Sequence, residues 1–347
     1  MASNITPSRL CAAGAVALLF AHPASGHHSG SEYDRSRIIE VEGRLVEFAW
    51  QNPHVHFTVE ALPDAQGKRV VWDIETNSVS ILRRTNATPE NLHNGDHIKI
   101  AGSPSKRAPN RMFATNLLRA DGVELVLGAS QPRWRTTAMG SKTTWLEGGT
   151  ATSGGLFHVW GTQLAPGARR LWRESYPLTP AAQKTFAKWD PLHDTVAPGC
   201  RPKGMPTIME QPYPIEFVKK GDSIVLRMEE YDTVRTVYMS ANAAFEALPK
   251  NRLGRSQGHW EGKTLVVKTD RIDWPYLDSS GVPQSPGSTL LEHFTPSDDG
   301  SRLDYTLVVT DPQMFTEPVE LKRSWVARPG EAVKPYNCVD TKKPARS

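Results

Sequence analysis

The feature that most constrains the fold of this chain is a repeated alternation of apolar and polar residues in short runs. In residues 54–60, Val55, Phe57 and Val59 alternate with polar residues. This period of two is typical of a strand with one buried face. Turn signals such as Asn94-Gly95 and Asp121-Gly122 separate the runs,. The sequence therefore predicts an all-β protein. No apolar run approaches 18 residues and no heptad array is present, which excludes a multi-span membrane protein and a coiled coil,.

The first half of the chain predicts a small barrel over residues 27–127. Residues 38–60 read as a curved strand pair, and further strand-like runs follow at 68–75, 97–102, 112–118 and 123–127. A short helix is expected at 78–84, with Ser78 as its N-cap. This order of elements is that of an OB-like barrel. Trp50 and Trp72 are as likely to belong to the core as to form an exposed platform for bases, and the net charge is only +4, so no nucleic-acid partner is expected,.

The second half predicts a larger antiparallel β domain over residues 156–340, after a linker at 128–155 that is rich in Gly, Ser and Thr. Its strand-like runs are 215–218, 223–229, 233–239, 263–269, 290–295, 301–310 and 319–327. One helix is expected at 179–189, where Thr179 precedes a proline. A calycin-like barrel and a sandwich both fit this pattern. Residues 341–347 read as a loose tail.

The N-terminal segment has the three parts of a signal peptide. Arg9 precedes the apolar run Leu10–Ala21, which is too short to span a bilayer, and small residues at Ala24 and Gly26 follow,. We expect residues 1–26 to be removed, with His27 as the mature N-terminus. The mature protein is then periplasmic or secreted, with no transmembrane span.

Two cysteines remain after Cys11 is removed with the signal peptide. They are Cys200 and Cys338. Because an exported protein meets an oxidising compartment, we expect them to form a disulfide, and two free thiols are the alternative.

Two resemblances support this division. The first half resembles an uncharacterised exported family, family 6152 of the domains of unknown function, over about residues 27–127. The matching residues are His27-His28-Ser29, Glu32-Tyr33-Asp34, Gly43, Trp50-Gln51-Asn52-Pro53-His54, Leu82-Arg83-Arg84, Gly95-Asp96 and Gly102. The second half resembles a widespread uncharacterised extracytoplasmic β module through Pro212-Tyr213-Pro214, Val234-Arg235, Gly258-His259-Trp260-Glu261-Gly262, Thr264-Leu265-Val266-Val267 and Asp311-Pro312. Neither resemblance implies a known activity.

The histidines near the mature N-terminus are candidate metal ligands. The amine and the imidazole of His27 can chelate one metal ion, and His54 and His56 point to the same face of their strand. A site rich in imidazole nitrogens suits Cu(II), and then Ni(II) or Zn(II). His28 is a further candidate. Glu32 or Asp34 is placed to supply an oxygen ligand.

Each of these histidines also has an ordinary structural interpretation. His28 is then a bystander, His54 fixes the turn after Asn52-Pro53, and His56 is a solvated surface residue,.

The second domain offers two other kinds of candidate site. Ser256 stands in a G-x-S-x-G motif with His259 nearby, which gives weak catalytic candidates for a serine hydrolase,. The required strand–turn–helix context is missing, and a turn with two glycines is the ordinary interpretation of the motif. Polar residues that alternate along the strands can line a barrel mouth and bind a small ligand. The candidates are Arg227, Tyr231, Arg235, Trp260 and His293, and a solvated sheet face is the alternative.

Three functions follow from these patterns. The leading hypothesis is a periplasmic protein that binds a divalent metal ion, with copper preferred. The second is a carrier of a small ligand, or a module that contacts another envelope protein, without a metal. The third is a serine-type hydrolase.

Overall fold

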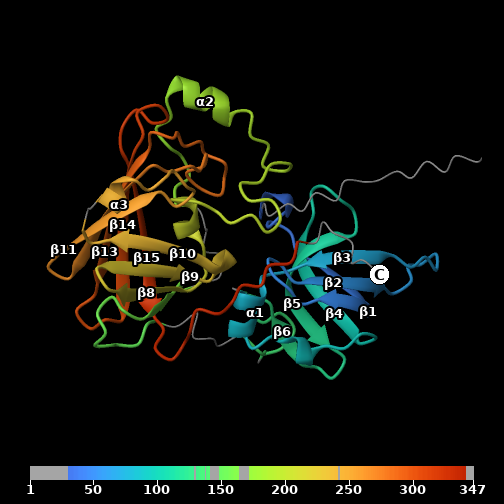
Figure 1. Cartoon of the computed structure of the whole chain (residues 1–347). Helices are drawn as coiled ribbons and strands as arrows, with labels where there is room; N and C mark the ends of the chain where they lie inside the picture. The colour runs from blue at the N-terminus through green and yellow to red at the C-terminus, as the bar shows by residue number, and fades with distance from the viewer. Residues whose placement is uncertain are drawn as a thin grey trace, which may run out of the picture.

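The computed structural model describes residues 30–128, 130–136, 138–140, 148–163, 172–240 and 243–340. The predicted signal peptide, His27, His28 and the tail at 341–347 lie outside these residues. Two β-barrels lie side by side (Figure 1). The all-β prediction is therefore confirmed.

The first barrel closes in the way that the OB-like prediction requires. Its strands are β1 (Ile39–Ala49), β2 (His56–Ala61), β3 (Val71–Glu75), β4 (His97–Pro104), β5 (Arg111–Arg119) and β6 (Glu124–Val126). The sheet order is β3-β2-β1-β4-β5-β6, and a parallel pairing of β3 with β5 closes the barrel. The alternation read from the sequence holds, since Val55, Phe57 and Val59 are completely buried.

One short helix and two single helical turns accompany the strands of this barrel. Helix α1 (Val79–Arg84) lies between β3 and β4, and the Ser78 side chain accepts a hydrogen bond from the backbone of Ile81, as expected of an N-cap,. The single turns η1 (Gly30–Glu32) and η2 (Pro89–Asn91) precede β1 and β4.

The second barrel is larger and has nine strands. They are β7 (Val159–Gly161), β8 (Ile215–Lys220), β9 (Ser223–Met228), β10 (Thr233–Tyr238), β11 (Arg255–Glu261), β12 (Thr264–Asp270), β13 (Thr289–Pro296), β14 (Arg302–Thr310) and β15 (Val319–Ala327). They form a closed barrel rather than a sandwich. Every strand pair is antiparallel except β10 with β11. The remaining elements are α2 (Pro180–Phe186), α3 (Ala243–Glu246), η3 (Thr207–Glu210) and η4 (Glu230–Asp232).

Two parts of the second barrel differ from the sequence expectation. The expected turn around Ser256 is wrong, because Ser256 lies within strand β11, where inward and outward residues alternate. Strand β7 was not predicted, since three residues are too few to show a periodicity. Thr179 caps α2 as predicted, but the helix ends at Phe186.

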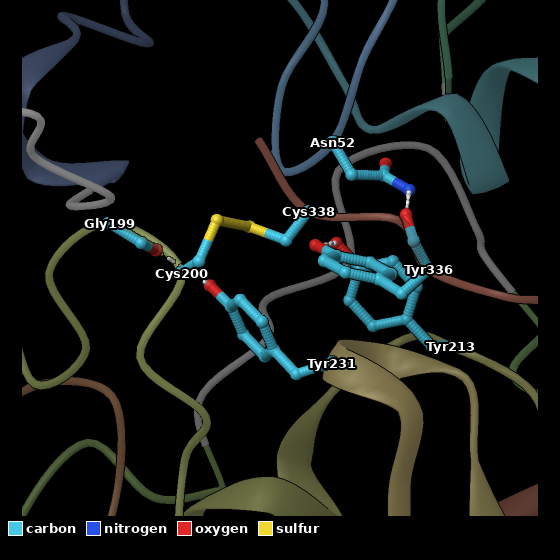
Figure 2. Close-up of a disulfide and its surroundings, with 7 residues drawn as sticks. All are labelled: Asn52, Gly199, Cys200, Tyr213, Tyr231, Tyr336 and Cys338. Atoms are coloured by element: carbon cyan, nitrogen blue, oxygen red, sulfur yellow. Dashed lines mark hydrogen bonds between the residues drawn. A yellow bond between two sulfur atoms is a disulfide. The ribbon is translucent and has the colours of Figure 1, made fainter. Parts of the chain in front are cut away.

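The predicted disulfide between Cys200 and Cys338 is present, with a Cα–Cα distance of 5.7 Å. It lies where the C-terminal segment leaves the second barrel and reaches the first (Figures 1 and 2). There the Asn52 side chain donates a hydrogen bond of 2.5 Å to the carbonyl of Tyr336, and the amide of Val339 donates one of 2.9 Å to the carbonyl of Asn52. The C-terminal segment therefore ties the two barrels together.

An ion pair adds to this junction. Glu229, which is only 1% exposed, lies 3.2 Å from the guanidinium of Arg83 and 3.9 Å from that of Arg84. Parts of the expected linker contact the barrels rather than hang free. Glu124 accepts hydrogen bonds from the backbone amides of residues 133–135, so this stretch packs on the first barrel.

Candidate functional site

His54 and His56 lie on the outer face of the first barrel, where the sequence pattern places them. Val55, which lies between the two histidines in the sequence, and Phe57, which follows His56, point into the core and are completely buried. The histidine side chains are partly covered, with 22% and 30% of their surface exposed. The two side chains thus lie on the same face of the barrel, and each is partly accessible to solvent.

Both rings are held by hydrogen-bond acceptors on the neighbouring strand β3 and just beyond it. The Nδ1 atom of His54 lies 2.8 Å from the carbonyl oxygen of Thr76 and 3.0 Å from Oε1 of Glu75. Because a carbonyl can only accept, Nδ1 carries a proton, and in the neutral ring the lone pair is on Nε2. The Nδ1 atom of His56 lies 3.5 Å from Oδ1 of Asp73. Asp73 and Glu75 on β3 are two positions apart, as are His54, which lies just before β2, and His56, the first residue of β2.

Glu75 connects this pair to the start of the described chain. The hydroxyl of Tyr33 donates a 2.7 Å hydrogen bond to Oε2 of Glu75, and Arg111 lies 3.3 Å from the same oxygen. Burial disfavours the charged form of Glu75, but His54, His56, the Tyr33 hydroxyl and Arg111 outweigh it and lower its pKa,. Glu75 is therefore an ionised carboxylate that orients His54.

The two acidic residues proposed from the sequence as oxygen ligands face elsewhere. Glu32 accepts a hydrogen bond of 3.1 Å from Ser105 and lies 3.3 Å from Nε of Arg111. Asp34 accepts hydrogen bonds from the amide and hydroxyl of Ser36 in an exposed turn. Neither contacts a histidine ring in the described part of the chain.

Among the described residues, no group of three or more His, Cys, Asp or Glu side chains is arranged to hold a metal ion. His54 and His56 supply two nitrogens, and the predicted partners His27 and His28 fall outside the described ranges. A complete metal site at this pair therefore needs a ligand from the N-terminal residues or from solvent.

Ser256 and His259 lie on opposite faces of strand β11. Ser256 is 1% exposed, and its hydroxyl accepts a 3.0 Å hydrogen bond from Nε of Arg235 inside the barrel. The His259 side chain is 63% exposed and lies 2.9 Å from Glu261 on the outer face. An odd separation on a strand always divides two side chains in this way. The structure does not bring the hydrolase candidates together.

The candidate ligand-binding residues are also dispersed. Arg235 is buried in the core of the second barrel, whereas Arg227 is on the outer face, 2.7 Å from Glu216. Trp260 is 42% exposed on the outside. His293 lies between the inward-facing neighbours of β13 and so points outward.

Tyr231 lies beside the disulfide, where its hydroxyl donates a hydrogen bond to the carbonyl of Gly199 (Figure 2). Large apolar side chains such as Phe294 and Leu226 fill the barrel interior. The five candidates therefore do not line one pocket.

Sequence reasoning missed the acceptors that hold the histidines. Asp73 and Glu75 are two positions apart along β3, as His54 and His56 are at the start of β2. That alternation is visible in the sequence, but the pairing of the two strands is not. Arg111 gave no sequence signal, because it reaches the cluster through the closure of β5 on β3.

No helix in the described part of the chain is long and apolar enough to cross a membrane. Two crystal structures of Rim1, the mitochondrial single-stranded DNA-binding protein of S. cerevisiae, are similar to part of the chain. They share 13% and 12% identity, cover 24% of this chain and 93% and 92% of their own, and have a TM-score of 0.20. No curated protein matches the sequence. Residues 16–112 match the model of a family of unknown function, DUF6152, which confirms the resemblance predicted for the first half of the chain.

Proposed function

We propose that this protein binds a divalent metal ion, with Cu(II) preferred, through His54, His56 and the mature N-terminal His27. One observation carries the proposal. The Nδ1 atoms of His54 and His56 both face acceptors on and just beyond β3, which are the Thr76 carbonyl with Glu75 for His54 and Asp73 for His56. Histidines that ligate metals commonly engage the second ring nitrogen with a carboxylate or a backbone carbonyl in this way.

The ligand type favours copper. Two imidazole nitrogens, joined by the amine and imidazole of an N-terminal histidine, give a nitrogen-rich set. Such a set suits Cu(II) above Ni(II) and Zn(II) in the usual order of affinity. The neighbouring carboxylates of Asp73 and Glu75 lower the cost of placing a positive ion at the histidine pair,.

The course of the chain supports the third ligand. Tyr33 is anchored to Glu75, which itself contacts His54. Only the residues from 27 to 33 separate the predicted N-terminus from this anchor, a stretch that spans at most about 20 Å when extended. An amine at residue 27 is therefore within reach of the histidine pair.

We further propose that the protein works in the periplasm after removal of residues 1–26. The Cys200–Cys338 disulfide supports this location, since disulfides persist in oxidising compartments,. The location also matters for the site, because cleavage after Gly26 is what creates the N-terminal amine of His27.

The test is a calorimetric titration of the mature protein, beginning at His27, with Cu(II). We expect one ion per chain. The variants His27→Ala, His54→Ala and His56→Ala should each weaken binding by more than the about 10–100-fold typical of losing a second-shell partner. His97→Ala is the matched control, because His97 is an exposed histidine on β4 that lies 3.9 Å from Glu42.

An N-terminal Ala-Ser extension tests the amine separately. It keeps all the side chains and should weaken binding as much as His27→Ala does. Equal Cu(II) affinity in the wild type and in all three histidine variants would refute the proposed function.

A further inference from the structure

A cavity of about 400 Å³ lies where the two barrels meet, beside the histidine pair but distinct from it. The first barrel contributes four charged side chains, and the loop after α2 lines the other side through Leu192 and His193. The lining residues that matter are Glu32, Lys106, Arg107, Arg111, Leu192 and His193. Its volume is in the range of pockets that hold small molecules.

The charges in this cavity are unequal. Arg111 is neutralised by Glu32, Asp73 and Glu75, at distances of 3.3 to 3.5 Å. Arg107 lies 3.8 Å from Glu32, and in the described ranges Lys106 has no ion pair within 4 Å. The nearby Asp34, whose pKa is lowered by hydrogen bonds from Ser36 and by the charges of Arg37 and Lys106, does not line the cavity. Lys106 and Arg107 therefore face the cavity as cations. The one carboxylate that lines the cavity, that of Glu32, is already paired with Arg111. An anion is the ligand that balances this excess.

Glu32 adds a second requirement. Its side chain is 1% exposed, and its Oε2 atom, which lies 3.8 Å from Nη1 of Arg107, accepts no hydrogen bond from any described residue. A buried carboxylate oxygen without a donor is unfavourable, so a molecule that occupies the cavity gains by donating to it. The ligand should then carry a hydroxyl or ammonium group next to its negative charge.

We propose that the cavity binds a small hydroxy- or amino-carboxylate. Its carboxylate would pair with Lys106 and Arg107, and its donor group would hydrogen-bond to Oε2 of Glu32. Arginine and lysine together give charge-assisted hydrogen bonds to a carboxylate. Since Leu192 and His193 complete the cavity, the ligand contacts both barrels and stabilises their contact. This site needs no metal and is independent of the function proposed above.

The experiment compares L-malate with succinate, which differ by one hydroxyl, in calorimetric titrations of metal-free protein prepared with EDTA. We expect L-malate to bind at least about tenfold more tightly, because succinate leaves Oε2 of Glu32 without a donor. Lys106→Gln/Arg107→Gln should weaken L-malate binding at least about tenfold through the loss of two charge-assisted contacts. Glycine and propionate test an amino-carboxylate ligand in the same way, because only glycine carries an ammonium group that can donate to Oε2 of Glu32.

The matched control is Lys68→Gln/Arg69→Gln. It removes an adjacent lysine and arginine that are exposed and line no part of the cavity. Retained affinity in this control, with an unchanged thermal unfolding curve in both variants, supports the proposal. The proposal is overturned if neither L-malate and succinate nor glycine and propionate bind. It is also overturned if the cavity variant and the control variant weaken binding equally, or if the two members of each probe pair bind equally well. None of these results depends on whether the histidine pair binds copper.

Discussion

Arg235 and Glu292 form an ion pair that is enclosed in the core of the second barrel. Neither residue is more than 1% exposed, and Nη1 of Arg235 donates a 2.9 Å hydrogen bond to Oε1 of Glu292. Tyr305 donates to the same carboxylate at 2.9 Å. Burial opposes the charge of Arg235, but Glu292 outweighs it and raises the pKa of the guanidinium,. Arg235 therefore has a structural role in the core and does not line a ligand site.

We predict that Arg235→Met destabilises the protein by about 3–5 kcal/mol, because it leaves Glu292 buried without a countercharge. Urea unfolding followed by tryptophan fluorescence measures the loss. The double variant Arg235→Met/Glu292→Leu should recover much of it. Arg227→Met is the control, since Arg227 pairs with Glu216 on the surface and its loss should cost less than about 1 kcal/mol,. Similar losses for the two single variants would contradict the prediction.

Removing the disulfide with Cys200→Ser/Cys338→Ser should lower the free energy of unfolding. The two cysteines are 138 positions apart. The chain-entropy model for a loop of this size gives about 4–5 kcal/mol. Thermal unfolding of the variant beside the wild type, each with and without a reducing agent, measures the effect. The reducing agent should shift the wild type only, and a variant that unfolds at the temperature of the oxidised wild type would contradict the prediction.

The stability of the protein should fall as the pH rises from about 4.5 to about 7. Burial and the charge of Asp278 raise the pKa of Glu210 from 4.5 to about 7. Between these values the folded state keeps a proton that the unfolded state has lost, so ionisation of the unfolded chain favours unfolding. The full cost, reached above pH 7, is about 3 kcal/mol.

Glu210→Gln tests this pH dependence, because the amide stays neutral and its oxygen can still accept the hydrogen bond from the Ser279 amide. Chemical unfolding gives the free energy of unfolding at pH values of about 5 and 8. The decrease between these two pH values should be smaller by about 3 kcal/mol in the variant than in the wild type. Glu320→Gln, at an exposed position, should behave as the wild type. An unchanged difference in Glu210→Gln would show that another group is responsible.

Asp73→Asn should weaken Cu(II) binding by about 10–100-fold, although Asp73 is not a proposed ligand. The change removes the carboxylate that orients His56. A change in the NMR chemical shifts of the His56 ring would report the lost contact directly. Asp96→Asn is the control, because Asp96 lies 3.8 Å from the exposed His93 of the same barrel. Equal Cu(II) affinity in both variants and the wild type would argue against this role of Asp73.

The local pattern was sufficient for the elements and for the direction of their side chains. The alternation around Phe57 correctly placed His54 and His56 on one outer face, and Ser78 and Thr179 correctly marked two helix starts. It was not sufficient at Ser256, where two glycines resembled a turn but the residue continues a strand. Turn preferences are weak there, because pairing with β12 along the whole of β11 decides the conformation,.

The sequence by itself determined an all-β chain, its two β domains, the cysteine pair and the histidines on one face, since these depend on periodicity and composition. Only the tertiary structure decided which residues surround them. Asp73 and Glu75 meet the histidines through strand register, and Arg111 through barrel closure. Arg235 was expected to line a ligand site and instead holds Glu292 in a filled core. Such contacts depend on pairing between distant segments, which no local pattern encodes.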